Sequence, residues 1–248
     1  MKKREQSSLM EDKGLDRMVA LSDGLFATVL TLLVLDLRLP DAISSQGTDV
    51  ITFVKWLGPH LFSYLLTFLV AGIYWMAHHR NFGYITGSDR TLLGYNLLFL
   101  LFIGLLPFST AAIGVTAGPS AGVYPFYWAI YCANLILAGL LSALCWLYAL
   151  SHGFVDSNVT RSRSRAIVAR QLATPAVFLL SAILEFLFRR YFLGPVSLML
   201  VPVSQRFVDR AYAGTNADHR GWTDRLWRAG SVAIWLLIIG LAIWAMSF

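Results

Sequence analysis

The residues best suited to chemistry are a few polar side chains that interrupt long apolar runs. Arg17, Ser22 and Asp23 stand at the start of the first apolar run, and His78 lies near the end of the second. A charge at the centre of a membrane span costs about 3 kcal/mol on insertion scales, so each of these residues needs a partner or a task. Asp23 and His78 can exchange protons, and all four residues can join helices by hydrogen bonds.

Neither a metal centre nor a catalytic centre is predicted. No Cys, Asp or Glu stands at ligand spacing from His78. The glycine-rich phosphate loop and the HExxH motif are missing from the sequence. Cys132 and Cys145 both lie inside one apolar run, which argues against a disulfide framework. We therefore expect no enzyme activity, no cofactor and no bound metal.

The composition predicts a polytopic membrane protein of the all-α class. Of 248 residues, 57% are apolar and 14% are charged, with a mean hydropathy of +0.62. Soluble domains are about 45–50% apolar and about 25% charged, so a water-soluble globule and a disordered chain are both excluded. About 20 apolar residues cross a bilayer as a helix. The predicted spans are 18–38, 52–77, 92–115, 122–150, 168–188, 191–208 and 229–247.

The basic residues predict the orientation of the chain. Sixteen of the 20 Lys and Arg lie in residues 1–17, 80–90, 161–170 and 206–228, which alternate with the apolar runs. Cytoplasmic segments of membrane proteins carry such an excess of Lys and Arg, so the N-terminus is expected in the cytoplasm. The net charge of +6 is thereby explained by topology, and a nucleic-acid partner is not expected. The predicted location is the plasma membrane.

The sixth apolar run leaves two alternatives. It is short, and it contains Gly194, Pro195 and Pro202, so it could cross the membrane or enter it only part of the way. We prefer a crossing, because otherwise the Arg-rich segment 204–228 would lie on the outer side. Residues 209–228 are then expected as a cytoplasmic amphipathic connector, and residues 229–248 as an additional transmembrane helix.

Small and hydroxyl residues form a stripe along the first apolar run. Gly24, Thr28, Thr31 and Leu35 follow one another at the spacing of a single helix face. Such a stripe is typical of a close contact between helices, because small residues let two backbones approach in lipid. A water-filled pore lined by this face is the alternative, and the spacing alone does not decide between them.

Four segments resemble the lysosomal potassium channel family (transmembrane protein 175) and its prokaryotic relatives. Residues 17–27, RMVALSDGLFA, are similar to the RxxxFSD signature of that family, and residues 32–40 resemble the end of its first helix. Residues 75–82, WMAHHRNF, resemble its second-helix WxxHHRxF segment. Residues 105–111 are similar to its third-helix IPFPTA stretch.

The resemblance implies a channel unit of six helices without a P-loop, here residues 1–208, whose first helix, residues 18–38, lines the pore. A single copy of the signature implies a homotetramer in membrane lipid, with K⁺ and other monovalent cations as the permeating species. The polar network of the family would comprise Arg17, Ser22, Asp23 and His78. The pore-lining residues would be Thr28, Thr31, Leu32 and Leu35.

Two residues depart from the family pattern. Thr28 stands where a bulky aliphatic residue forms the constriction of the family, and Leu21 replaces the Phe of the signature. A ring of hydroxyls can partly replace the water around an ion, so we expect a wetter pore with Leu35 as its main apolar barrier. Two other functions are considered: a proton-coupled or cation transporter that uses Asp23 and His78, and a membrane interaction protein that conducts nothing.

Overall fold

The computed structural model of the chain describes residues 2–37, 50–116, 124–188, 193–198 and 200–212. Their regular elements are all helices, apart from one isolated bridge between two connections. The elements are α1 (Lys2–Leu33), the 3₁₀ turn η1 (Val34–Leu37), α3 (Val50–Phe82), α4 (Arg90–Gly104), α5 (Leu106–Thr116), α6 (Tyr124–Ser151), α7 (Arg161–Phe188), α8 (Leu193–Ser197) and α9 (Leu200–Ala211).

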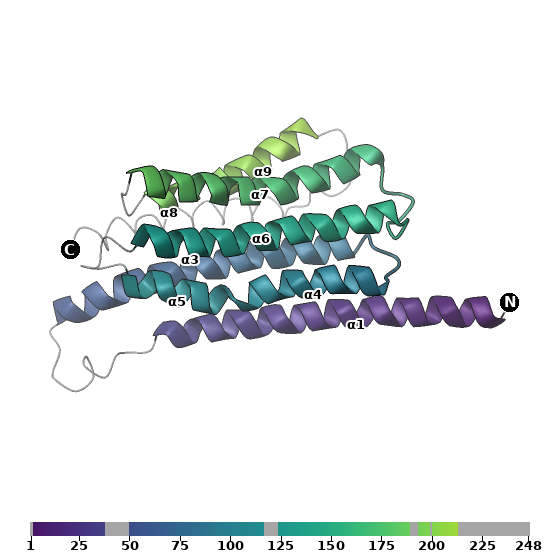
Figure 1. The fold of residues 1–248 in the computed structure, drawn as a ribbon, viewed down its shortest axis with the longest axis horizontal. Coiled ribbons are helices and arrows are strands. Elements are labelled where there is room, and N and C mark those ends of the chain that lie inside the picture. The colour runs from purple at the N-terminus through teal and green to yellow at the C-terminus, as the bar shows by residue number, and fades with distance from the viewer. Residues whose placement is uncertain (1, 38–49, 117–123, 189–192, 199, 213–248) are drawn as a thin grey trace, which may run out of the picture.

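The long helices form an elongated bundle with α1 at one edge and α7 and α9 at the opposite edge (Figure 1). The start of α1, the α3–α4 connection and the α6–α7 connection lie at the same end, which we call the N-terminal end of the bundle. Three of the four Lys- and Arg-rich segments therefore begin or connect helices at one end, as the orientation predicted from the charges requires.

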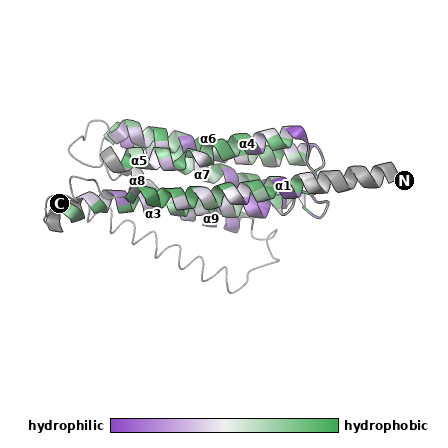
Figure 2. Cartoon of the chain, turned by 90° about the horizontal axis from the view of Figure 1, so that it is seen from below, coloured by the Kyte–Doolittle hydropathy of each residue, from purple (hydrophilic) through white to green (hydrophobic). Residues whose placement is uncertain are grey.

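Four helical stretches are long and apolar enough to cross a membrane: Trp56–Phe82, Arg90–Ile113, Tyr124–Ser151 and Arg161–Phe188. Hydrophobic residues colour most of the helix surfaces between the two ends of the bundle (Figure 2). The predicted class, an all-α polytopic membrane protein, is confirmed. The additional helix predicted at residues 229–248 and most of the connector before it lie outside the described residues.

Helix α1 begins at Lys2 and not at the predicted residue 18, and α3 ends at Phe82 and not at 77. Three further predictions differ from the structure. The third span is two helices, α4 and α5, because the chain turns at Leu105 and Pro107 lies in the first turn of α5, where no N–H is needed. Helix α7 begins seven residues before the predicted 168, because the Thr160 hydroxyl accepts the backbone N–H of Arg163 and caps the helix. The sixth run is divided into α8 and α9.

The core depends on close packing of α6 against α7. Trp128, Tyr131 and Phe178 are fully buried in it. Pro175, inside α7, lies so close to Gly139 of α6 that a Cβ atom on the glycine would be 2.3 Å from the proline Cγ. A side chain at position 139 would therefore push the two helices apart.

Two connections close the N-terminal end of the bundle. Ile85 and Val155 form an antiparallel bridge, and Arg163 donates from Nη2 to the Tyr84 hydroxyl at 2.6 Å. Asp89 accepts the backbone N–H of Leu92 at 2.8 Å as the N-cap of α4, and the Tyr148 hydroxyl at 2.7 Å. Burial acts to raise the pKa of Asp89, but these hydrogen bonds outweigh it and the pKa lies below its ordinary value. The cap is therefore ionised at neutral pH and is lost in strong acid.

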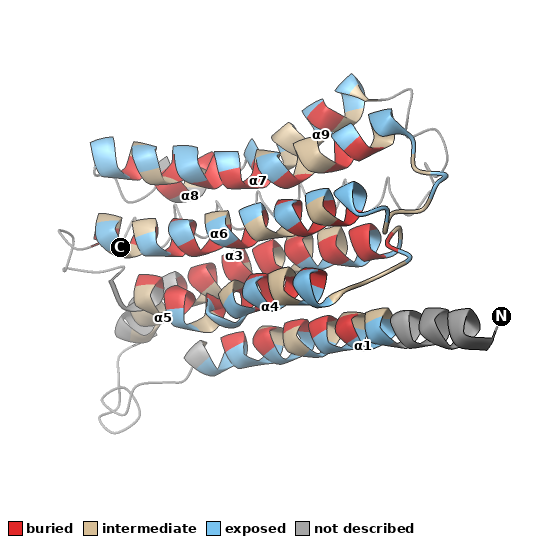
Figure 3. Ribbon diagram, turned by 45° about the vertical axis from the view of Figure 1, so that its right-hand side comes forward, coloured by how far each residue is buried: buried red, intermediate tan, exposed pale blue. Residues whose placement is uncertain are grey.

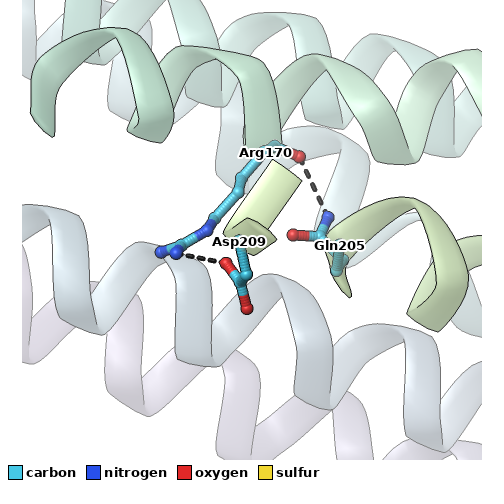
Figure 4. Close-up of polar contacts among 3 residues, drawn as sticks. All are labelled: Arg170, Gln205 and Asp209. Atoms are coloured by element: carbon cyan, nitrogen blue, oxygen red, sulfur yellow. Dashed lines mark hydrogen bonds and ion pairs between the residues drawn. The ribbon is translucent and has the colours of Figure 1, made fainter. Parts of the chain in front are cut away.

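Helix α9 is attached to α7 through polar side chains (Figure 4). Arg170 forms an ion pair with Asp209, and the Gln205 amide donates to the Arg170 carbonyl at 3.0 Å and to the Thr174 hydroxyl at 2.9 Å. Arg170 was predicted in a connection, but the early start of α7 places it nine residues inside the helix. Its charge is compensated there by the carboxylate of Asp209.

We predict that Asp209→Asn lowers the free energy of unfolding by about 1–3 kcal/mol, between the values for exposed and buried ion pairs, because Arg170 loses its counter-charge. Thermal unfolding of the purified protein in detergent measures the effect. The matched control is Arg210→Gln, since Arg210 is the exposed neighbour of Asp209 on α9. Equal melting temperatures for the two variants would contradict the role of the pair.

Candidate pore helix and polar network

Helix α1 packs through one face only. Met18, Ser22, Phe26, Val29 and Leu33 form a stripe along it, and each is at most 2% exposed. This stripe lies against α3, α4 and α5. The buried face of α1 thus holds the helix to its own protomer over four turns.

The other face of α1 is uncovered in the single chain (Figure 3). Thr28 and Thr31 are exposed, and Leu32 and Leu35 expose 43% and 45% of their surface. A Cβ atom added to Gly24 would have no neighbour within 4 Å. All four residues predicted to line a pore, three on α1 and Leu35 on η1, are therefore exposed in the single chain.

The hydroxyls on this face are oriented by the helix itself. Thr28 donates to the Gly24 carbonyl at 2.9 Å, and Thr31 donates to the Thr28 carbonyl at 2.7 Å. Each hydroxyl has one hydrogen and two lone pairs. Because the hydrogen is used by the backbone, the oxygen is left as an acceptor, which suits a cation.

A buried chain of hydrogen bonds joins α1, α4 and α3. The Ser22 hydroxyl donates to the Met18 carbonyl at 2.9 Å, so its oxygen accepts the Asn96 amide at 3.0 Å. The amide oxygen of Asn96 then faces His78 Nε2 at 3.0 Å, so that nitrogen carries the hydrogen. At each step of this series of hydrogen bonds, the preceding bond fixes which atom donates and which accepts. Asn96 was missed from the sequence, although it is a polar residue in an otherwise apolar run.

His78 is enclosed by aromatic rings. Its imidazole stacks on Phe82 at 4.1 Å and on Phe99 at 5.4 Å between centroids. The remaining nitrogen, Nδ1, is buried and has no hydrogen-bond partner among the described residues. His78 and Asn81 both line a cavity of about 10 Å³, which is room for one water molecule. At 2% exposure, His78 is a structural link between helices and does not reach the uncovered face of α1.

Asp23 and Arg17 lie apart from this chain. Asp23 Oδ1 accepts the indole N–H of Trp75 of α3 at 2.9 Å. Arg17 is exposed and makes no hydrogen bond or ion pair with the other described residues. The structure thus brings Ser22 and His78 together through Asn96, gives Asp23 a neutral partner, and leaves Arg17 outside. Trp75 was not singled out from the sequence, because an indole near a helix end is common in membrane proteins.

We predict that Asn96→Ala lowers the free energy of unfolding by about 2–3 kcal/mol, because the His78 N–H and the Ser22 oxygen lose their partners away from water. Thermal unfolding in detergent measures the loss. Leu97→Ala, at a residue 47% exposed on the same helix, serves as the control and should change the value by less than about 0.5 kcal/mol. A similar loss in both variants would show that the chain of hydrogen bonds contributes nothing.

Comparison with known proteins finds a family model that matches the segment containing this network. Residues 17–107 match the sequence model of the family described as "Endosomal/lysosomal potassium channel TMEM175". The resemblance predicted from the sequence is thereby confirmed for this part of the chain. The matched segment contains α1, α3, α4 and the beginning of α5, and with them both the uncovered stripe and the buried chain.

Two bacterial relatives are described as potassium channels. The protein of Streptomyces collinus is 39% identical over 97 residues, which are 39% of this chain and 46% of the relative. The protein of Chamaesiphon minutus is 25% identical over 173 residues, which are 69% of this chain and 84% of the relative. The matched family and these relatives are described as channels and not as enzymes.

Animal relatives are longer. The human protein described as "Endosomal/lysosomal proton channel TMEM175" is 27% identical over 193 residues, which are 75% of this chain and 37% of the relative. The chain thus spans less than half the length of the Streptomyces and human proteins. The fold agrees with a crystal structure from Chamaesiphon minutus, described as that of a homologue of the lysosomal potassium-selective channel TMEM175. The TM-score is 0.66 at 22% identity, and the match covers 79% of this chain and 99% of that one.

Proposed function

We propose, from the TMEM175 family match at residues 17–107, that this multi-pass membrane protein is the subunit of a cation channel that prefers potassium. Four copies would surround an axis with their α1 helices and pass ions between them. The N-terminus would lie in the cytoplasm, and the channel would work in the plasma membrane. The potassium channels among the bacterial relatives support this assignment.

The observation that carries the proposal is the chemistry of the uncovered face of α1. The exposed faces of α6 and α7 consist mainly of leucine, isoleucine and phenylalanine, as suits contact with lipid. The exposed face of α1 instead has Gly24, Thr28 and Thr31 in its middle. Small and hydroxyl residues in lipid favour contact between helices or with water. This face is therefore the part of the surface best suited to meet other copies around an aqueous path.

A single protomer cannot enclose a path with one helix, so the proposal requires an assembly. Closed rotational symmetry repeats the same face of α1 around an axis. In such a ring the Thr28 and Thr31 oxygens point their lone pairs inward, because their hydrogens are bound to the helix backbone. Four oxygens at one level can replace part of the water around a K⁺ ion. Leu35, at the same face farther along, would form the apolar barrier.

Proton transport is the alternative that the animal relatives favour, because they are described as proton channels. In this chain His78 is bonded to Asn96 and Asp23 to Trp75, so the two titratable groups are not directly linked. The geometry thus gives a coupled transporter no continuous relay between them. Proton flux is measured in the same experiment as K⁺ flux.

We predict that Thr28→Ile lowers the single-channel K⁺ conductance at least about threefold, because an aliphatic ring excludes water. Leu35→Ala should raise the conductance or reduce the preference for K⁺ over Na⁺. Both are measured with purified protein in planar bilayers.

The control is Leu98→Ala, at an apolar residue of α4 that is 47% exposed. This variant should conduct as the unmodified protein does. Unchanged currents in both the Thr28 and the Leu35 variants would place the ion path elsewhere, and currents carried by protons alone would favour the alternative.

We predict that single cysteines on the uncovered face of α1 form disulfides between copies. The two native cysteines are buried in α6, so replacing them by alanine gives a background without free thiols. Thr31→Cys in this background should yield a cross-linked dimer on mild oxidation in membranes, and Leu140→Cys on the exposed face of α6 should not. Cross-linking through Leu140 and not through Thr31 would remove α1 from the axis.

A further inference from the structure

One carboxyl group lies inside the membrane-spanning part of α7. Glu185 is 1% exposed and is surrounded in sequence by leucine, isoleucine and phenylalanine. An acidic side chain at such depth is costly and marks a site with a task. Arg189, one turn later in the sequence, lies outside the described residues, and Glu185 is turned into the bundle.

Glu185 and Ser181 hold the beginning of α8. The backbone N–H of Gly194 donates to Glu185 Oε2 at 2.9 Å, and the Ser181 hydroxyl donates to the Gly194 carbonyl at 2.8 Å. Ser197 donates to the same carbonyl at 2.6 Å, and the indole of Trp128 donates to Ser181 at 3.1 Å. Both backbone groups of Gly194 are thus bound by side chains of α7, with α6 supporting them.

The backbone at Gly194 packs closely against side chains of α6 and α7. A Cβ atom on Gly194 would lie 2.5 Å from Trp128 Nε1 and 2.9 Å from Glu185 Oε2. Only glycine can therefore bring the backbone of α8 against the carboxyl group. The contact is the point where the sixth apolar run, α8 and α9, meets the far end of α7.

No described cation compensates Glu185. Its second oxygen, Oε1, is buried and has no hydrogen-bond partner. Of the elements packed on α7, α6 and α8 contain no Asp, Glu, Lys, Arg or His, and the Cys132 thiol of α6 is the titratable group that faces Glu185. The charged residues of α9 are Arg206, Asp209 and Arg210, and Asp209 pairs with Arg170 of α7. Arg170 lies about 22 Å along α7 from Glu185, so this charged part of α9 is far from the carboxyl group. An uncompensated carboxylate is far costlier there than a neutral carboxyl group.

We propose that Glu185 is a proton-binding site, and that its neutral carboxyl group latches α8 and α9 to the bundle at Gly194. Glutamate in water releases its proton near pH ~4.3, so an undocked Glu185 is ionised at neutral pH. The docked state then holds one proton more than the undocked state. The stability of docking is therefore full in acid and falls as the pH rises. The site is independent of the proposed pore, because it lies on a different helix and faces the interior.

The test is thermal unfolding of the full chain in detergent from pH 5 to pH 9, with and without Glu185→Gln. Glutamine keeps the acceptor for the Gly194 N–H and cannot ionise. The melting temperature of the unmodified protein should fall with rising pH by several degrees more than that of the variant, and the two should agree at pH 5. Equal pH profiles, or a variant that is less stable at every pH, would overturn the proposal.

Two controls separate the proton from the packing. Ser197→Ala removes a bond to the same Gly194 carbonyl without removing a titratable group, so it should lower the melting temperature equally at every pH. Replacing both Arg189 and Arg190 by Gln should leave the pH profile unchanged. A profile that becomes flat in the double variant would mean that Glu185 is ionised and paired with an arginine, contrary to the proposal.

A spectroscopic measurement on the unmodified protein does not depend on the folding of any variant. The chain contains only three glutamates, and the other two, Glu5 and Glu11, lie in the polar N-terminal segment. With ¹³C-labelled glutamate, infrared spectra at pH 7 should show one protonated and two ionised carboxyl groups. Three ionised groups at pH 7 would refute the proposal.

Discussion

The fold depends on the need of each polar side chain inside the membrane to find its partner within the protein. Lipid offers no hydrogen bonds, so an unpaired donor or acceptor between helices costs free energy, and apolar contact alone gives little preference for one helix pair over another. The Ser22–Asn96–His78 chain fixes α1, α4 and α3 relative to one another at one height. Arg170 with Asp209, and Glu185 with Gly194, do the same for α7 with α9 and α8.

These links fix helix rotation as well as helix position. Because Ser22 faces Asn96, the residues on the opposite side of α1 face outward, and these include Thr28 and Thr31. The buried network therefore determines which side of α1 would be available to the proposed pore. Under that proposal, a change at Asn96 would act on conduction through the rotation of α1, whereas a change at Thr28 would act on the ion path directly.

The sequence was sufficient to predict features that repeat along the chain. It was insufficient to predict features that depend on a single partner residue in another helix. The apolar runs predicted the membrane-spanning class and five of the long helices to within a few residues, apart from the N-terminal extension of α1 and the earlier start of α7. The break at Leu105 leaves hydropathy unchanged, and Thr160 resembles any loop residue until its hydroxyl caps α7. Asn96 and Trp75 could not be assigned roles, because their partners lie 74 and 52 residues away in sequence. Glu185 could not be assigned a role either, because its partner Gly194 lies nine residues later in another helix.

The two faces of α1 differ in chemistry: one is packed against the bundle, and the other is the proposed wall of an ion path. A threonine in a helix bonds its hydroxyl to a carbonyl in the preceding turn, which in a soluble protein weakly competes with the helix. In a membrane the same bond fixes the hydrogen and leaves the oxygen lone pairs directed outward from the helix axis. At an uncovered position this converts a donor into a permanent acceptor, which discriminates in favour of cations without any formal charge. In the proposed pore, Thr28 and Thr31 would favour cations through the hydrogen bonding of their own helix, and a bulky aliphatic residue at position 28 would keep the helix but lose the acceptor.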